Sequence, residues 1–195
     1  VNAVLTEENC PLITDNQILS LINEIALHKC EKAYKSLFVE MHESLIDFAN
    51  SFLNSTEDAE EVVSDFFIVI WKRRESLGEI KYPKLYFFAG VKNTALNRIK
   101  LNKRQHITTG TDWQSSLRSI FFNPEELMLS HESVKNIMKV INELPPRCKM
   151  VFKLVKEEGF KYAEVSQLLD ISIKTVEAQM AIAFKRLKDS SEFKN

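Results

Sequence analysis

The sequence contains little glycine, proline or cysteine. Its 195 residues include 4 glycines, 5 prolines and 3 cysteines, whereas an average glycine content of about 7% would give roughly fourteen. So few glycines disfavour folds with many tight turns and sites built on glycine-rich phosphate loops. Cys10, Cys30 and Cys148 form no Cys-x-x-Cys pair, so the spacing indicates neither a disulfide framework nor a zinc knuckle. We expect a mostly helical protein whose cysteines are reduced packing residues.

Long hydrophobic runs are also missing. The longest, 66–71, has six residues, whereas a membrane-spanning helix needs about twenty. We therefore expect no membrane insertion. The sequence starts with acidic residues such as Glu7 and Glu8 rather than with a basic and apolar leader, which predicts a cytoplasmic protein.

No set of residues typical of catalysis stands out. The four histidines, His28, His42, His106 and His131, are far apart and show no His-x-x-x-His spacing. Neither a Ser–His–Asp arrangement nor a metal-ligand cluster is evident. We therefore expect no enzyme, no catalytic residue, no metal, no cofactor and no small-molecule substrate.

Charge is strongly segregated along the chain, although the net charge is −1. Residues 1–71 contain 3 Lys/Arg and 13 Asp/Glu, whereas residues 72–105 contain 10 Lys/Arg and 2 Asp/Glu. An ordinary solvated surface would mix the two signs. The basic block at 72–105 therefore indicates an anionic partner, most simply nucleic acid.

Hydrophobic periodicity predicts an all-α fold with two small helical domains. In the first, 27–105, apolar residues spaced by three and four predict a helix over 32–53. Ser55 is placed to cap a second helix that ends near Trp71, and Pro83 to begin a third. Residues 1–26 form an N-terminal extension, and residues 15–28 could be helical.

The period lapses over 106–122, which we interpret as a flexible linker. A second domain then spans 123–190 and begins with a helix capped by Asn123, with Pro124 in its first turn. Pro145 and Pro146 stop that helix and start the next one.

Residues 160–187 fit a helix-turn-helix. Apolar positions of 160–169 line one helix, Asp170 to Ser172 make the turn, and Val176, Met180, Ala183, Phe184 and Leu187 line the second helix. In such a unit the second helix lies in the DNA major groove. Its candidate DNA-facing residues are Lys174, Thr175, Glu177, Ala178, Gln179, Ala181, Lys185 and Arg186. Gln179 suits adenine, Glu177 suits cytosine, and the cations suit phosphates. An ordinary helical hairpin has the same periodicity.

Two motifs in the same order resemble a known family. The strings Leu144-Pro145, Glu158-Gly159-Phe160 and Leu169-Asp170-Ile171-Ser172, with Thr175-Val176, resemble region 4 of extracytoplasmic-function (ECF) sigma factors of bacterial RNA polymerase, in the sigma-70 family. Asp58-Ala59-Glu60-Glu61-Val62-Val63, followed by Phe66, Trp71, Leu85-Tyr86, Asn93 and Asn97, resembles region 2. Asp170 stands where the family usually has glycine, which Asp tolerates because it visits left-handed conformations. The string Thr175-Val176-Glu177 is similar to versions from Bacteroidetes.

The resemblance implies an alternative sigma factor that binds core RNA polymerase, recognises promoter DNA and promotes initiation. Region 2 would bind polymerase through Asp58, Glu60, Glu61, Asp65 and Phe66. It would bind and open the minus-ten element through Lys81, Tyr82, Tyr86, Lys92, Asn93, Asn97, Lys100 and Arg104, with Phe87 a further candidate platform for bases. Region 4 would contact the minus-thirty-five element, and an anti-sigma factor, possibly membrane-anchored, would be a partner.

One alternative is a helix-turn-helix regulator of the response-regulator output type, which has a similar Ser-x-x-Thr-Val string at Ser172 to Val176. The first half of the sequence lacks the strand–helix alternation of a receiver domain, which disfavours this alternative.

Overall fold

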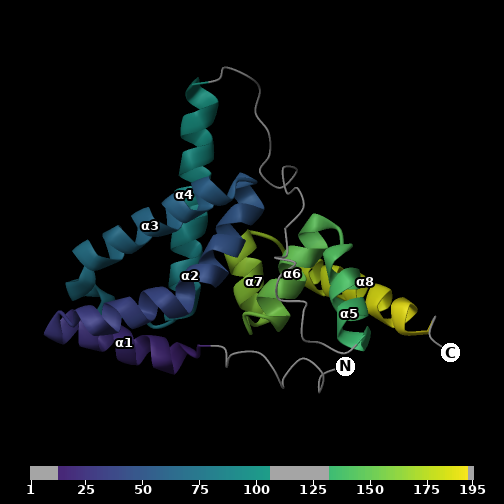
Figure 1. Ribbon diagram of the computed structural model, residues 1–195, viewed down its shortest axis with the longest axis horizontal. Coiled ribbons are helices and arrows are strands. Elements are labelled where there is room, and N and C mark those ends of the chain that lie inside the picture. The colour runs from purple at the N-terminus through teal and green to yellow at the C-terminus, as the bar shows by residue number, and fades with distance from the viewer. Residues whose placement is uncertain (1–12, 106–131, 193–195) are drawn as a thin grey trace. The chain divides into compact units, whose positions relative to one another are not determined.

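The computed structural model describes residues 13–105 and 132–192, and within these ranges all regular structure is helical. Two compact units divide the chain, as expected for a two-domain all-α protein. The first holds α1 (Asp15–His28), α2 (Glu31–Leu53), α3 (Thr56–Lys72), the 3-10 helix η1 (Arg74–Glu79) and α4 (Pro83–Gln105) (Figure 1). The second holds α5 (Glu132–Asn142), α6 (Pro146–Lys156), α7 (Tyr162–Leu169) and α8 (Ile173–Glu192). The predicted linker 106–122 and the predicted cap at Asn123 lie outside the described residues.

Helices α3 and α4 begin at the predicted signals. The Ser55 hydroxyl accepts a hydrogen bond from the Asp58 backbone N–H at 3.2 Å and so caps α3. Pro83 is the first residue of α4, where its missing N–H leaves no helical bond unmade. Between α2, α3 and α4 lies an aromatic core, in which the rings of Phe48 and Phe88 have centroids 5.0 Å apart. None of the helices in the described ranges is long and apolar enough to span a bilayer.

Helix α1 belongs to the first domain rather than to a separate extension over 1–26. Thr14 and Gln17 form a reciprocal capping box that starts the helix, and the fully buried Ile18, Ile22 and Ile25 face α2, η1 and α4. The Asp15 carboxylate accepts a hydrogen bond from the Lys84 backbone N–H at 3.0 Å. Since this bond satisfies an N–H in the first turn of α4, α1 helps to fix where α4 begins. The first domain therefore starts before residue 15 and not at residue 27.

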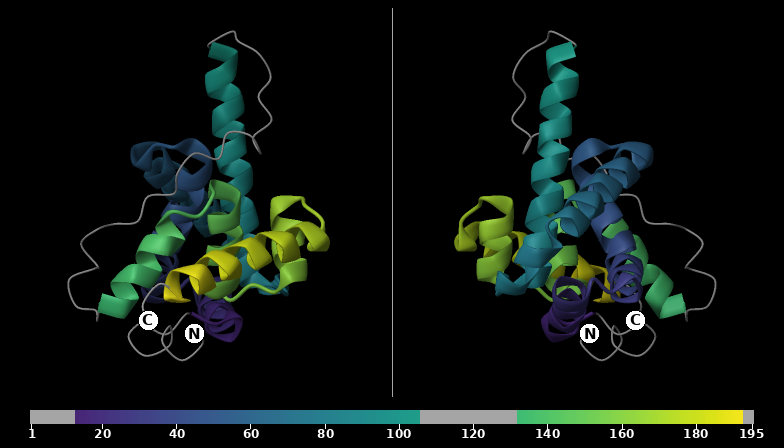
Figure 2. Two further views of the ribbon diagram at one scale, coloured as in Figure 1. Left: turned by 90° about the vertical axis from the view of Figure 1, so that its right-hand side faces the viewer. Right: turned by 90° about the vertical axis from the view of Figure 1, so that its left-hand side faces the viewer.

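In the second domain, α8 packs against α5, α6 and α7 (Figure 2). Val176, Met180 and Ala183 of α8 are buried, as their spacing predicted. The thiol of Cys148 in α6 donates a hydrogen bond to the Gln179 carbonyl at 3.1 Å. Burial raises the pKa of this thiol, against a smaller opposing effect of Arg186. Cys148 and Cys30 are free thiols, whereas Cys10 lies outside the described residues.

Helices α3 and α4 approach closely where α4 carries Gly90. The ring of Phe66, which is 6% exposed, lies directly against this glycine, and a Cβ atom at position 90 would overlap the ring. Phe66 also packs against Phe87, with centroids 5.6 Å apart. The absence of a side chain at position 90 therefore sets the distance between the two helices.

We expect Gly90→Ala to destabilise the first domain by about 1–3 kcal/mol, because the added methyl group overpacks the Phe66 contact. Helix propensity favours alanine by about 1 kcal/mol and only partly offsets this. Urea denaturation followed by circular dichroism measures the change. Gly78→Ala is the matched control, since the atom nearest a Cβ there is 3.8 Å away. Equal stability of the Gly90→Ala variant and the wild type would contradict this account of the packing.

Candidate nucleic-acid and polymerase interfaces

An exposed stripe of polar and aromatic residues follows one side of α4. Tyr86, Asn93, Asn97 and Lys100 are separated by seven, four and three positions, which places them on the same helical face. All four are exposed, and Tyr82, just before the helix, is 63% exposed. Lys81 is exposed beside it. We call Tyr82, Tyr86, Asn93, Asn97 and Lys100 the α4 stripe.

The last turns of α4 stand clear of α2 and α3 in both Figure 1 and Figure 2. Leu101, in these turns, is 57% exposed. Arg104 is in the same part of the helix, but its side chain lies outside the described residues. The α4 stripe thus extends to Lys100, close to the turns of α4 that stand clear of α2 and α3.

Three residues expected at the interfaces are buried instead. Lys92 is 7% exposed, so its side chain is not part of the exposed surface expected to bind DNA. Phe87 is fully buried in the aromatic core and offers no platform for a base. Phe66 lies between α3 and α4 against Gly90, so it packs inside the domain and does not reach a partner.

The acidic residues of α3 lie on its outer side. Glu57, Glu60, Glu61 and Asp65 are exposed and Asp58 is half-buried. Ile68, one turn after Asp65, is 50% exposed and adds an apolar surface to the acidic one. Ile68 is not among the residues predicted for this interface; its position seven residues after Glu61 was the signal that could have placed it on this face. We call Glu57, Glu60, Glu61, Asp65 and Ile68 the α3 face.

Arg98 links α4 to this acidic helix. Its Nη2 donates to Asp58 Oδ1 at 3.3 Å and also to Glu61 Oε2. The hydrogen bond to Glu61 is the main cause of a raised pKa of Arg98, and Asp58 adds to it. The sequence placed Arg98 in the basic block but gave no indication that α3 carboxylates hold it.

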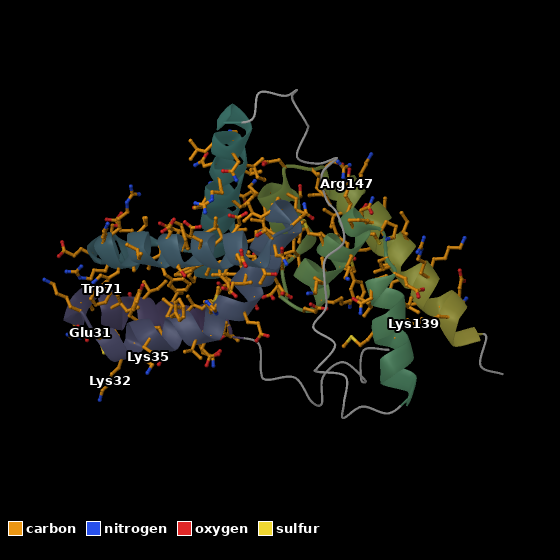
Figure 3. All side chains as sticks on the ribbon, turned by 45° about the horizontal axis from the view of Figure 1, so that its top comes forward. Glu31, Lys32, Lys35, Trp71, Lys139 and Arg147 are labelled. Atoms are coloured by element: carbon orange, nitrogen blue, oxygen red, sulfur yellow. The ribbon has the colours of Figure 1, made fainter. Side chains whose placement is uncertain are left out.

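The other end of the first domain is a packed aromatic corner. Figure 3 shows Trp71 at the same end of the domain as Glu31, Lys32 and Lys35 of α2. The Trp71 and Tyr34 rings have centroids 4.9 Å apart, and the Arg74 guanidinium stacks 5.0 Å from the Trp71 centroid. Arg74 Nη1 also donates to the Trp71 carbonyl at 3.0 Å. Trp71 and Arg74 therefore serve packing at this corner.

The second domain contains the predicted helix-turn-helix. Asp170 ends α7 in the left-handed region, with φ 54° and ψ 45°. The Ile171 N–H donates to the Ser166 carbonyl at 3.1 Å, and the Ser166 hydroxyl returns a bond of 2.6 Å to the Ile171 carbonyl. Ser172 Oγ accepts from the Thr175 N–H at 3.1 Å and caps α8. These bonds fix the direction in which α8 leaves the turn.

The outer side of α8 carries most of the predicted DNA-facing residues. Exposed positions are Lys174, Thr175, Glu177, Ala178, Ala181, Lys185 and Arg186. Gln179 is half-buried, which places it at the edge of this surface. Its backbone carbonyl accepts a hydrogen bond from the Cys148 thiol. Arg186 Nη1 donates to the Glu143 carbonyl at 3.0 Å, which ties it to the end of α5. Phe184, expected in the core, is 40% exposed and packs by its ring edge against Phe152.

Comparisons with known proteins match both domains. Residues 37–105 match the family "Sigma-70 region 2", and residues 135–187 match "Sigma-70, region 4". The chain is 27% identical over 160 residues to the "ECF RNA polymerase sigma-E factor" of Escherichia coli K12, of Salmonella typhimurium LT2 and of Shigella flexneri, covering 77% of this chain and 82% of each relative. The chain belongs to the sigma-70 family. It is an alternative sigma factor that acts in transcription initiation and has no enzymatic activity of its own.

Two solved structures share the fold of this sigma factor. One is CnrH in complex with the cytosolic domain of CnrY, with a TM-score of 0.51 and 17% identity over 92% of this chain and 99% of that chain. The other is the sigma factor RpoE with the anti-sigma factor NepR from Bartonella quintana, with a TM-score of 0.55 and 17% identity over 84% of this chain and 99% of that chain. In residues 13–105 and 132–192 of the sigma factor, no three His, Cys, Asp or Glu side chains are grouped so that they could hold a metal ion.

We expect Ser172→Ala to destabilise the second domain by about 1 kcal/mol, because the Thr175 N–H loses its cap at the start of α8. Ser172→Asp keeps a capping oxygen and should retain most of the stability. Thermal unfolding of the two variants, followed by circular dichroism at 222 nm, measures the difference. A Ser172→Asp variant as unstable as Ser172→Ala would argue against capping as the role of this hydroxyl.

Proposed function

We propose that the α4 stripe of this sigma factor binds the minus-ten element and keeps its bases unstacked. The observation that carries this proposal is the alignment of Tyr82, Tyr86, Asn93, Asn97 and Lys100 on one exposed side of α4. Opening a duplex needs aromatic surfaces that replace base stacking and polar groups that bind base edges. The stripe offers both, and Lys81 and Lys100 add charge for the phosphate backbone. Arg104 is assigned to the same surface from its place in the sequence.

The α3 face is proposed to bind core RNA polymerase. Its exposed carboxylates and Ile68 suit a partner helix that presents basic residues around an apolar one. Asp58 contributes from the edge of this face, although Arg98 occupies part of its carboxylate. Phe66 is left out of the contact because it is buried.

The outer side of α8 is proposed to enter the major groove at the minus-thirty-five element. Lys174 and Lys185 are assigned to phosphates, and Thr175, Glu177 and Ala178 to the surface that meets base edges. Gln179 reads a base only from the edge of this surface. Arg186 has a structural bond to the end of α5 and a secondary role in phosphate binding.

Further partners and the setting are also proposed. An anti-sigma factor, possibly membrane-anchored, is a proposed partner, supported by the likeness to sigma factors solved with CnrY and NepR. Since polymerase and chromosomal DNA are cytoplasmic, the sigma factor is proposed to act in the cytoplasm. The string Thr175-Val176-Glu177 supports an origin in Bacteroidetes. The first domain is proposed to span 27–105 together with α1, and the second domain is proposed to span 123–190.

Reconstitution with core RNA polymerase tests the proposed function. The sigma factor should form a complex with core enzyme from a Bacteroidetes species and start specific transcripts from genomic DNA fragments of that species. Core enzyme alone, and core enzyme with the Asp58→Lys/Glu61→Lys variant, are the controls. Failure of the wild type to bind core enzyme would refute the assignment of the α3 face.

We expect Asn93→Ala to reduce the rate of promoter opening about tenfold while binding of the closed complex changes little. The reason is the loss of a hydrogen bond, worth about 1–2 kcal/mol, that is made only to an unpaired base. Permanganate footprinting of unpaired thymines measures opening, and gel shift at low temperature measures closed binding. Asn102→Ala, an exposed asparagine on another side of α4, is the control. Equal losses in both measurements would contradict the assignment.

We expect Lys185→Ala to weaken binding to duplex promoter DNA and to lower the slope of log affinity against log salt by about one, as expected for one lost phosphate contact. Lys139→Ala removes an exposed lysine of α5 in the same domain (Figure 3) and should leave the slope unchanged. Fluorescence anisotropy over a series of salt concentrations measures both variants. If both lysines lowered the slope equally, the outer side of α8 would have no special role.

A further inference from the structure

We propose that Arg98 couples the two interfaces of the first domain by exchanging its carboxylate partners on α3 for DNA phosphates when polymerase binds. This inference rests on the proposed function, because it takes the α3 face as the polymerase surface and the α4 stripe as the DNA surface. It adds a role for a residue that belongs to neither surface in the free protein.

The geometry places Arg98 between the two surfaces. It follows Asn97 of the α4 stripe directly in the chain, and it reaches across to Asp58 and Glu61 of α3. Both contacts use the same nitrogen, Nη2. In the free protein the guanidinium is therefore held on the α3 side and the charge of Arg98 does not add to the DNA surface.

The two ion pairs are weak enough to be exchanged. The side chains of Arg98, Asp58 and Glu61 are 28%, 35% and 55% exposed, and pairs open to solvent contribute little to stability. Glu61 is also part of the α3 face, so a basic helix bound there competes for the same carboxylate. Arg98 stays protonated in either state, because its guanidinium cannot lose its proton near neutral pH.

Polymerase binding then changes the ion-pair partner that is available to Arg98. Once basic groups of the partner pair with Asp58 and Glu61, they repel the nearby guanidinium as well as displace it. The anion best placed to receive it is a phosphate of DNA on the α4 stripe, next to Asn97. Core enzyme and DNA therefore bind cooperatively through this residue, and the coupling acts equally in both directions.

The first test measures the affinity of the full chain for core enzyme. Arg98→Gln should bind core about fivefold more tightly than the wild type, because the ion pairs of Asp58 and Glu61 with Arg98 no longer have to be broken before these carboxylates bind core. Its complex with core should bind a single-stranded dT20 oligonucleotide more weakly, with a smaller salt slope. Arg98→Lys, which keeps the charge, should lie between the two. A purely structural Arg98 would give weaker binding of both ligands, and that result would overturn the proposal.

The second test needs no polymerase, so its failure is distinct from failure of the proposed function. In the free chain, Asp58→Asn/Glu61→Gln should release Arg98 and raise the affinity for dT20 at low salt by about fivefold. Glu57→Gln/Asp65→Asn removes the same charge from exposed positions of α3 that do not contact Arg98, and should give a smaller rise. Adding Arg98→Gln to the first variant should remove its extra affinity. Equal effects of the two double variants would overturn the proposal.

Discussion

The contact between Phe66 and Gly90 determines how near α3 and α4 lie to each other, and the rest of the first domain depends on that distance. Because α4 has no side chain at this point, the Phe66 ring can pack between the two helices and meet Phe87 in the core. The same approach brings Arg98 within reach of Asp58 and Glu61. One helix pair thus presents an acidic surface on α3 and an aromatic, polar and basic one on α4.

In the second domain, one side of α8 packs into the core and the outer side is exposed. Val176, Met180 and Ala183 anchor α8 in the core, and the bonds of Ser166, Ile171 and Ser172 set its direction. The flanks of α8 are also engaged, through the Gln179 carbonyl and the Arg186 guanidinium. The outer side of α8, with Lys174, Glu177, Ala178 and Lys185, stays exposed. A helix with an exposed outer side suits insertion into the major groove.

The all-α fold, the two domains and most helix starts were predictable from the sequence, because signals such as the Ser55 cap and Pro83 in the first turn of α4 act within a few residues. The turn at Asp170 was predictable for the same reason. The burial of Lys92 and Phe87 was not, since periodicity gives a residue's angle about its own helix and not the position of the neighbouring helices. The contacts of Arg98 and Arg186 were also out of reach, because each joins residues about 40 positions apart. Tertiary packing therefore decided which charged residues face a partner.

Helix α1 has a practical consequence for work on this sigma factor. The segment that matches the region 2 family begins at residue 37, yet Ile18, Ile22 and Ile25 fill part of the core beneath η1, and Asp15 holds the first turn of α4. A fragment cut at the family boundary would expose the apolar surface that these isoleucines cover and would leave the Lys84 N–H without its acceptor. Binding studies on isolated region 2 should therefore use a fragment that starts no later than Thr14, the residue that caps α1.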